Sequence, residues 1–306
     1  MSMLKWNAKS IINPELAKQC IQDSPNNLLK VDSIEFFGQG WDNVAFLVNE
    51  KYIFRFPRNQ EADQLLCDEN LVLPKLCSMV PLQIPKLVYF GKPMPAYPFH
   101  FHGYEMLEGV PAYRVNLFDD ELKSCLKSLA QFLKKLHSIK SVQASAMGAQ
   151  IQMYDKTKVQ LVVESLQKRI EAILQKNIFV FNGAFIDQVI AQAQTVIIDH
   201  GDDCLVHGDL DYRHMLLQGS KLTGIIDWGD VGINHPVIDF VVIHGMFPRS
   251  MHEIFFETYG SVSEDIWSYA RFLALHRAIT LMMYGHDIKD TKMFDAAKQS
   301  YERLIF

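Results

Sequence analysis

The order of the predicted elements is the feature that most restricts the fold of this chain. Strand-like alternation between turn residues fills residues 31–106, whereas helical spacing dominates from about residue 120 onwards. Strands followed by helices indicate an α+β chain with a sheet-rich N-terminal lobe and a helix-rich C-terminal lobe. We place the lobe boundary at Gly109, which gives lobes of 1–108 and 109–306. The predicted strands of the first lobe are 31–37, 44–48, 52–56, 87–90 and 99–106.

Helices are predicted from apolar spacing in both halves. In the first half the pattern covers 61–76, although Pro74 should end or kink this helix early because proline lacks a backbone N–H. The strongest pattern follows Asp119-Asp120, an expected N-cap pair, and extends to Ile139. His137, near the end of this helix, is expected to cap or pack and not to catalyse. The other predicted elements are helices at 161–175 and 185–196 and strands at 204–206, 215–217 and 222–226.

Charge is distributed unevenly along the chain. Residues 1–190 carry 21 Lys and Arg against 19 Asp and Glu, whereas 191–306 carry 9 against 16, which gives +2 and −7. Nucleic-acid binders need a cationic footprint, so the acidic C-terminal part disfavours a nucleic-acid partner. It favours a cationic small ligand, and a merely solvated acidic face is an equally good interpretation.

The remaining bulk features predict a cytoplasmic protein without a membrane partner. No apolar run approaches the ~20 residues needed to span a bilayer, and the N-terminal ten residues lack the apolar core of a signal peptide. The five cysteines are odd in number and include no C-x-x-C pair. This usage is typical of reduced thiols in the cytosol and not of a disulfide framework or a zinc site.

Two aspartate-bearing turns carry the most informative chemistry. His207-Gly-Asp209 and Asp227-Trp-Gly-Asp230 each follow a short apolar strand, and their first aspartates stand 18 residues apart. Phosphoryl transfer needs one carboxylate to hold or accept the proton of the attacking hydroxyl, and others to hold Mg²⁺ against nucleotide phosphates. Asp209, Asp227 and His214 suit these tasks. Either motif alone could be ordinary turn chemistry, because Gly and Asp are common in turns.

Together these motifs resemble the signature of the aminoglycoside phosphotransferase family, small-molecule kinases with a two-lobed, protein-kinase-like fold. The resemblance covers roughly residues 30–300, and its specific motifs lie in 205–240. It implies that Asp209 is the catalytic base and that Asp227 and His214 are ligands of Mg²⁺. It also implies three supporting assignments: an N-terminal nucleotide-binding lobe, His207 as a residue that orients the loop, and Asp239 as a buttress of the site.

Two positions depart from the common family pattern. The family most often has Asn where this chain has His214, and His there is similar to the aminoglycoside 2''-phosphotransferases and the macrolide phosphotransferases. A neutral imidazole prefers softer ions than Mg²⁺, so the alternative role of His214 is to position the catalytic loop. Arg55 stands where many kinases have a phosphate-binding Lys. Its guanidinium can bridge phosphate oxygens, and a strand arginine that reaches the surface is the alternative.

The resemblance also implies a set of residues that bind ATP or GTP. Two glycines between the first strands would let backbone N–H groups close over phosphates, although a plain hairpin turn is an equal interpretation. Arg55 would pair with Glu69 on the following helix, with Asp68 as the rival partner. The segment before Gly109 resembles the hinge that pairs with a purine edge. The nucleotide-binding residues are predicted to be Gly38, Gly40, Asp42, Asn43, Arg55, Glu69, Glu105, Met106 and Leu107.

The acceptor is less constrained than the donor. A cationic antibiotic, with an aminoglycoside as the leading candidate, would suit C-terminal acids; a macrolide or another lipophilic alcohol would suit aromatic residues, whose alternative role is helix core. An endogenous amino alcohol and a nucleotide-binding pseudokinase are the further alternatives. The acids are Asp211, Glu253, Glu257, Glu264, Asp265, Asp287 and Asp290. The aromatic residues are Trp228, Phe247, Phe255, Trp267, Tyr269 and Tyr284.

Overall fold

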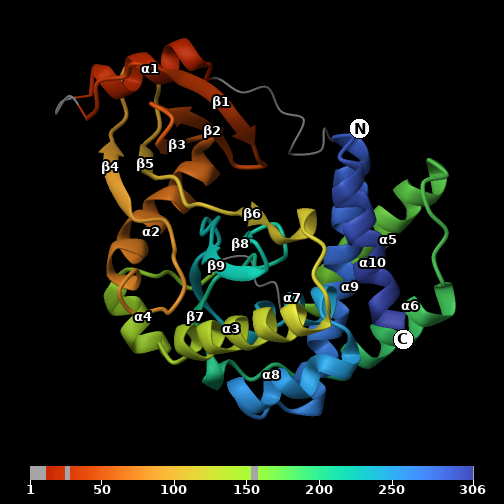
Figure 1. The fold of residues 1–306 in the computed structure, drawn as a ribbon. Helices are drawn as coiled ribbons and strands as arrows, with labels where there is room; N and C mark the ends of the chain where they lie inside the picture. Colours follow the sequence, from red (N-terminus) through yellow and green to blue (C-terminus); the bar gives the residue numbers. More distant parts are fainter. Residues whose placement is uncertain (1–11, 25–27, 153–157, 306) are drawn as a thin grey trace.

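The N-terminal lobe is built on one antiparallel sheet. The computed structural model describes residues 12–24, 28–152 and 158–305. The sheet has the strand order β1-β2-β3-β5-β4 and lies at the upper left of Figure 1. β1, β2 and β3 follow one another as hairpins, which places β3 at the centre with both of its faces covered. The strands are β1 (Ile34–Gln39), β2 (Asn43–Val48), β3 (Tyr52–Pro57), β4 (Leu87–Gly91) and β5 (Phe101–Glu105).

Alternation along β3 sends its side chains to two different cores. Phe54 and Phe56 join the apolar cluster that includes α1 (Pro14–Gln22). Ile53 belongs to the other cluster, which includes α2 (Gln60–Leu76) and the C-terminal lobe. Because side chains alternate along a strand, Arg55 shares the face of Ile53. The sequence of β3 therefore turns this arginine towards α2 and the second lobe.

The helix that follows β3 covers the predicted range without ending early at its proline. Pro74 was predicted to end or kink α2 early, but the helix runs to Leu76 and the Cys77 N–H still bonds to the Leu73 carbonyl at 3.1 Å. The missing N–H of Pro74 removes one helical hydrogen bond, and the bond of Cys77 in the next positions shows that the helix continues past it. Asn59 caps the other end by accepting from the Ala62 N–H at 2.9 Å.

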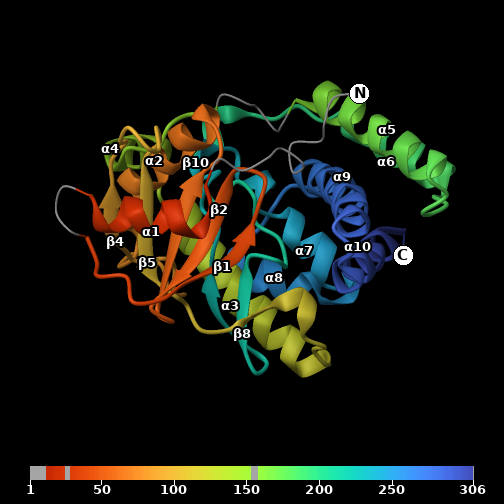
Figure 2. The ribbon, with the colours of Figure 1, turned by 90° about the horizontal axis from the view of Figure 1, so that it is seen from above.

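The C-terminal lobe is mostly helical, with two small sheets that carry the motif turns. β8 pairs with β6 and β9, and β7 pairs with β10. Figure 2 shows α9 and α10 beyond the sheet lobe, with α5 and α6 outermost. The strands are β6 (Val110–Pro111), β7 (Cys204–Val206), β8 (Met215–Gln218), β9 (Lys221–Ile225) and β10 (Gly232–Asn234). The helices are α3 (Asp119–His137), α4 (Ser141–Met147), α5 (Val159–Gln175), α6 (Gly183–Ala193), α7 (Val241–Met246), α8 (His252–Tyr259), α9 (Glu264–Asp287) and α10 (Thr291–Ile305).

Helix α9 is the axis of this lobe. Its 24 residues are buried around most of the circumference, and it packs against α5, α6, α7 and α10. A helix that is apolar all round is an interior helix, so the charged residues on it need specific partners. None of the helices in the described ranges is both long and apolar enough to span a membrane.

Two predictions about boundaries differ in their outcome. The N-cap of α3 is Phe118, so the prediction of an Asp119-Asp120 cap was wrong; both acids lie inside the first turn. There the Glu121 carboxylate accepts from the Phe118 N–H at 2.9 Å, and the acidic turn suits the positive end of the helix dipole. The lobe boundary at Gly109 stays a prediction, with β5 ending at Glu105 and β6 beginning at Val110.

Candidate functional site

The two aspartate-bearing turns are held together by His207. Its Nε2–H donates to the Ile226 carbonyl at 3.0 Å, and its Nδ1 accepts from the Asp209 N–H at 3.3 Å. This pattern requires the neutral ring, and burial lowers the pKa of His207 in agreement with it. Gly208, between His207 and Asp209, has φ +82°, and a Cβ there would collide with the Asp230 carbonyl. The geometry therefore needs both this histidine and this glycine.

Asp239 supports the first turn from beneath. Its carboxylate accepts from the N–H groups of His207 at 2.8 Å and Gly208 at 2.9 Å, and from His137 Nε2 at 3.1 Å. Burial alone would raise the pKa of Asp239, but the hydrogen bond and charge of His137 outweigh it and hold this pKa below its usual range. His137 also contacts the Tyr259 hydroxyl at 2.9 Å, so it packs beneath the site.

Arg55 links the two lobes through carboxylates. Its Nη1 donates to both oxygens of Glu69 at 2.8 and 2.9 Å, and its Nη2 donates to Asp227 Oδ1 at 2.9 Å. Of the two partners considered on α2, the structure selects Glu69, whereas Asp68 accepts from Gln64. Burial raises the pKa of Glu69 and the charge of Arg55 opposes the shift. The net result is a pKa of about 7, and the contact of both Glu69 oxygens with one guanidinium nitrogen favours the ionised form.

The predicted metal ligands face each other. His214 Nε2 and Asp227 Oδ2 are 3.3 Å apart. His214 Nδ1 lies 2.7 Å from the Asp209 carbonyl, which only accepts, so Nδ1 donates this hydrogen bond and Nε2 is turned towards Asp227. Neighbouring ligands of an octahedral divalent cation at about 2.1 Å stand about 3 Å apart, so this separation fits one ion. The two donors are therefore compatible with a shared Mg²⁺.

Asp227 has an unusual backbone conformation that suits this position. Its φ is +64°, in the left-handed region that non-glycine residues rarely adopt. Its carboxylate remains about half exposed, at 49%, while it contacts both Arg55 and His214. Burial raises the pKa of Asp227, but Arg55 and His214 lower it further than burial raises it. The result is an ionised carboxylate that is partly open to solvent.

The carboxylate of Asp209 is flanked by two arginines that the sequence analysis did not single out. Arg277, on α9, pairs with Asp209 Oδ1, and Arg213 Nη2 lies 3.4 Å from Asp209 Oδ2. Both arginines also bind Asp211, at 3.4 and 2.6 Å. Arg277 lies in a mostly apolar helical stretch, and a charge in such a stretch indicates a buried partner. That signal could have identified it.

The glycine-containing turn comprises the end of β1, with Gly38, and the connection to β2, with Gly40, and it is held from two sides. Arg58 Nη1 donates to the Gly40 carbonyl at 2.8 Å and to the Trp41 carbonyl at 3.3 Å. The Trp41 ring meets Tyr284 of α9 edge to face, with centroids 6.0 Å apart. A Cβ on Gly38 would meet nothing within 4 Å, and one on Gly40 only a carbonyl at 3.9 Å. Packing within the protein therefore does not explain these glycines.

The predicted hinge continues the pairing of β5. The Met106 N–H donates to the Lys51 carbonyl at 2.8 Å, and Glu105 pairs with Lys51 Nζ at 2.9 Å. Leu107 packs near Gly224 of β9. The Met106 N–H is therefore already used within the N-terminal lobe.

The acids predicted to bind a cationic acceptor do not form an open acidic pocket. Three of them are paired with cations: Asp211 with the two arginines above, Asp287 with Lys176 at 3.0 Å and Asp290 with Arg114 at 2.7 Å. Glu253, Glu257, Glu264 and Asp265 are exposed. Of the predicted aromatic residues, the alternative role of helix core is confirmed for Phe255 and Tyr269, whereas Trp228 and Phe247 are buried but lie outside the helices and strands.

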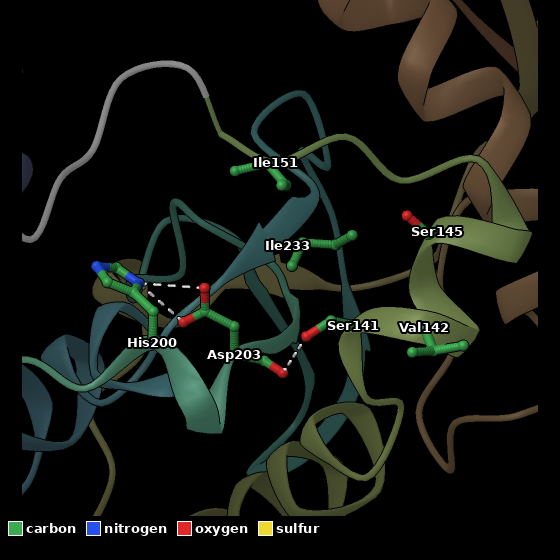
Figure 3. A pocket seen from close by; sticks show the side chains of 7 residues that line it. All are labelled: Ser141, Val142, Ser145, Ile151, His200, Asp203 and Ile233. Atoms are coloured by element: carbon green, nitrogen blue, oxygen red, sulfur yellow. Dashed lines mark hydrogen bonds and ion pairs between the residues drawn. The ribbon is translucent and has the colours of Figure 1, made fainter.

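A cavity of about 390 Å³ lies away from these residues, between α4, β10 and the turn before β7 (Figure 3). It contains a serine, a histidine and an aspartate, but not as a nucleophilic triad. Ser141 Oγ donates to the backbone carbonyl of Asp203 at 2.7 Å, whereas His200 Nδ1 pairs with the Asp203 carboxylate at 3.1 Å. The serine has no general base in contact with it, so this cavity lacks that chemistry.

The fold and the assembled motifs define a two-lobed, kinase-like phosphotransferase. The chain belongs to the APH phosphotransferase enzyme family, whose model matches residues 33–273. Among curated proteins it is 22% identical over 233 residues to the uncharacterized Bacillus subtilis protein YcbJ, covering 71% of this chain and 70% of that protein. It is 24% identical over 166 residues to an aminoglycoside 3'-phosphotransferase of Salmonella typhimurium, covering 52% of this chain and 58% of that enzyme.

Solved structures of two subclasses share the fold. The complex of APH(2'')-IIIa with GDP and kanamycin superposes with a TM-score of 0.70 at 24% identity, covering 94% of this chain and 98% of that one. Macrolide 2'-phosphotransferase type I superposes with a TM-score of 0.60 at 20% identity, covering 95% and 98%. The predicted kinase-like α+β fold is thereby confirmed, as is the prediction of a phosphotransferase enzyme.

Proposed function

We propose that this protein transfers the γ-phosphoryl group of ATP or GTP to a hydroxyl of a small molecule, with an aminoglycoside as the leading acceptor. The observation that carries the proposal is the position of Arg55, which binds Glu69 in its own lobe and Asp227 in the other. Kinases hold the transferring phosphates with a cationic side chain that is paired with a carboxylate of the N-terminal lobe and lies beside the catalytic turn. Arg55 has the same position relative to the turn of Asp209.

The N-terminal lobe would bind the nucleotide. Arg55 is already oriented by two carboxylates, so its guanidinium needs little reorganisation to contact a phosphate oxygen. The open space above Gly38 and Gly40 supports close approach of phosphates to the backbone of that turn, with Asp42 and Asn43 beside it. Purine pairing is proposed for the backbone of Glu105 and Leu107, because the Met106 N–H is engaged.

His214 and Asp227 would hold Mg²⁺. The ion would supply neutralisation of charge on the transferring phosphates. Asp227 contributes the hard oxygen donor, and the hydrogen bond from His214 Nδ1 to the Asp209 carbonyl fixes the ring with Nε2 turned towards it. This second-layer contact also ties the proposed metal site to the turn that carries the proposed base.

Asp209 would orient the acceptor hydroxyl and accept its proton. Its carboxylate is 23% exposed, so one edge of it remains accessible to an acceptor. Arg213 and Arg277 fix the orientation of this carboxylate, and Asp211 balances their charge. A base with a fixed orientation lowers the entropic cost of aligning the hydroxyl with the phosphorus.

Two acceptor classes are supported by different observations. The similarity to aminoglycoside enzymes supports an aminoglycoside, since one solved relative is a kanamycin complex. The pairing of Asp211, Asp287 and Asp290 with cations supports a less charged alcohol such as a macrolide, because those acids are already neutralised. We therefore keep the macrolide as a second candidate.

The test is a coupled assay of nucleoside diphosphate release with Mg²⁺. ATP and GTP are run in parallel against aminoglycosides, macrolides and small amino alcohols, with wild type, Asp209→Asn and Asp120→Asn as an exposed carboxylate control. We expect acceptor-dependent release that Asp209→Asn lowers by about 10²-fold or more while nucleotide-induced thermal stabilisation persists. Equal turnover in Asp209→Asn, or nucleotide binding without turnover on any acceptor, would contradict the proposal and favour a nucleotide-binding pseudokinase.

A further inference from the structure

A second cavity lies in the C-terminal lobe at the start of α9, whereas the glycine-containing turn contacts the same helix near its end. It has a volume of about 210 Å³ and opens between the first turns of α9, the end of α10 and the α7–α8 connection. Its lining contains five basic side chains and one carboxylate, that of the exposed Glu264. The basic residues are Arg249, Arg271, Arg303, His244 and His252.

The three arginines of this cavity differ from those of the catalytic cleft in their partners. Arg271 Nε donates to the Leu304 carbonyl at 3.0 Å, and Arg303 Nη1 donates to the Gly245 carbonyl at 3.2 Å. Arg249 is exposed. Within residues 12–24, 28–152 and 158–305, no ion pair joins any of the three to a carboxylate. Backbone contacts fix two of the guanidinium groups in place without a carboxylate in direct contact, although the charge of Glu302 partly offsets that of Arg303.

The positive charge of these arginines acts on neighbouring groups. Burial, and then the charge of Arg249, lower the pKa of Arg271. Burial lowers the pKa of His244 well below its usual value, and the charges of His252, Arg271 and Arg249 lower it further. Like charges that repel one another across a partly enclosed space create a positive potential there. An anion in the cavity would relieve this repulsion.

The shape and chemistry of the cavity restrict the anion. Guanidinium groups match the oxygen spacing of phosphate, and three of them can address separate oxygens of a tetrahedral group. A volume of 210 Å³ corresponds to about seven water molecules, which is room for a phosphate with a few attached atoms. Trp267, whose ring centroid lies 4.4 Å from that of His244, adds an apolar wall.

We propose that this cavity binds a small phosphate-bearing anion, either free phosphate or a compact phosphomonoester, at a site separate from the phosphotransfer cleft. None of its lining residues contacts Asp209, Asp227 or Arg55 among the bonds described above. Arg271 and Arg277 are six residues apart on α9, and this spacing directs them to different faces of the helix. The cavity in Figure 3 is a weaker candidate because its charged pair, His200 and Asp203, is already mutually satisfied.

The test is isothermal titration calorimetry on the full chain, at constant ionic strength and pH 7.5. Inorganic phosphate and glycerol 3-phosphate are titrated separately, with acetate as a monoanion control and with the nucleotide cleft saturated with Mg²⁺ and a nucleoside diphosphate. We expect saturable phosphate binding that Arg249→Gln weakens about tenfold, because one charge-assisted contact is lost. Tighter binding of phosphate would assign the free ion, and tighter binding of glycerol 3-phosphate would assign the ester.

Arg249 is the variant of choice because its side chain is exposed and makes no hydrogen bond or ion pair in the described part of the chain, so its replacement should not disturb folding. Lys127→Gln, an exposed lysine on α3, removes the same formal charge elsewhere. Its phosphate affinity should equal that of wild type. The proposal is overturned if no saturable phosphate binding occurs, if Arg249→Gln binds as tightly as wild type, or if Lys127→Gln weakens binding equally.

Discussion

The arginines around Asp209 and Asp227 and those of the second cavity occupy opposite electrostatic situations. Arg55, Arg213 and Arg277 each contact two carboxylates, whereas Arg271 and Arg303 contact backbone carbonyls. A paired arginine is a device for positioning: removing its partner leaves a buried charge without compensation. An arginine held only by carbonyls keeps its charge available to a ligand. The same residue type therefore serves structure in one region and recognition in the other.

The difference between paired and unpaired arginines is tested best at Glu69, where we expect the largest change in stability. Glu69→Gln keeps the shape of the side chain but leaves Arg55, which is buried, with Asp227 as its remaining carboxylate. We expect a loss of about 3 kcal/mol in the free energy of unfolding, measured by urea denaturation. Asp68→Asn, one residue earlier on the same helix, should change it by less than about 0.5 kcal/mol. Equal stability of the two variants would show that the ion pair contributes little.

An intermediate effect is expected at Arg277. Arg277→Met removes the cation that holds Asp209 Oδ1, so we expect kcat to fall about 10- to 100-fold while the KM for nucleotide stays unchanged. Arg277→Lys should restore part of the loss, because it returns the charge without the planar fork. Arg249→Gln, from the second cavity, should retain wild-type turnover. A raised nucleotide KM with unchanged kcat would assign Arg277 to binding and not to positioning of the base.

The smallest effect is expected in the pH dependence of stability. Because the pKa of His244 lies well below its usual value, the unfolded chain binds a proton below about pH 6.5 that the folded chain does not. Stability therefore falls as pH decreases from about 6.5, by up to about 1.4 kcal/mol for each unit by which this pKa is lowered. Urea midpoints at pH 7.5 and 5.5 should differ less for His244→Gln than for wild type, with exposed His286→Gln as the control. Identical slopes for all three proteins would argue against this origin.

The sequence predicted the fold and the two motif turns well because both depend on local patterns. Alternation fixed Arg55 on one face of its strand, and short apolar strands ahead of Asp209 and Asp227 fixed two sharp turns. The extent of α2 past Pro74 and the N-cap of α3 were missed because both depend on single hydrogen bonds at helix ends.

Contacts between distant segments could not be obtained from local patterns. Arg277 reaches Asp209 only because α9 passes behind the catalytic turn, and 68 residues separate the two in the chain. The same holds for the acids expected to attract a cationic acceptor, whose partners come from other helices, such as Lys176 for Asp287. The net charge of −7 for residues 191–306 therefore overstated the negative potential available to an acceptor, because it did not include cations from other segments.

Helix α9 touches three places at once: the second cavity through Arg271, the turn of Asp209 through Arg277 and the glycine-containing turn through Tyr284. Its 24 residues extend about 36 Å, since an α-helix rises 1.5 Å per residue. A stiff rod of this kind limits evolution as well as motion. Under the proposed function, a substitution that shifts its packing would disturb the glycine-containing turn and the orientation of Asp209 together, so lineages that acquire new acceptors should vary the surrounding loops and leave this helix intact.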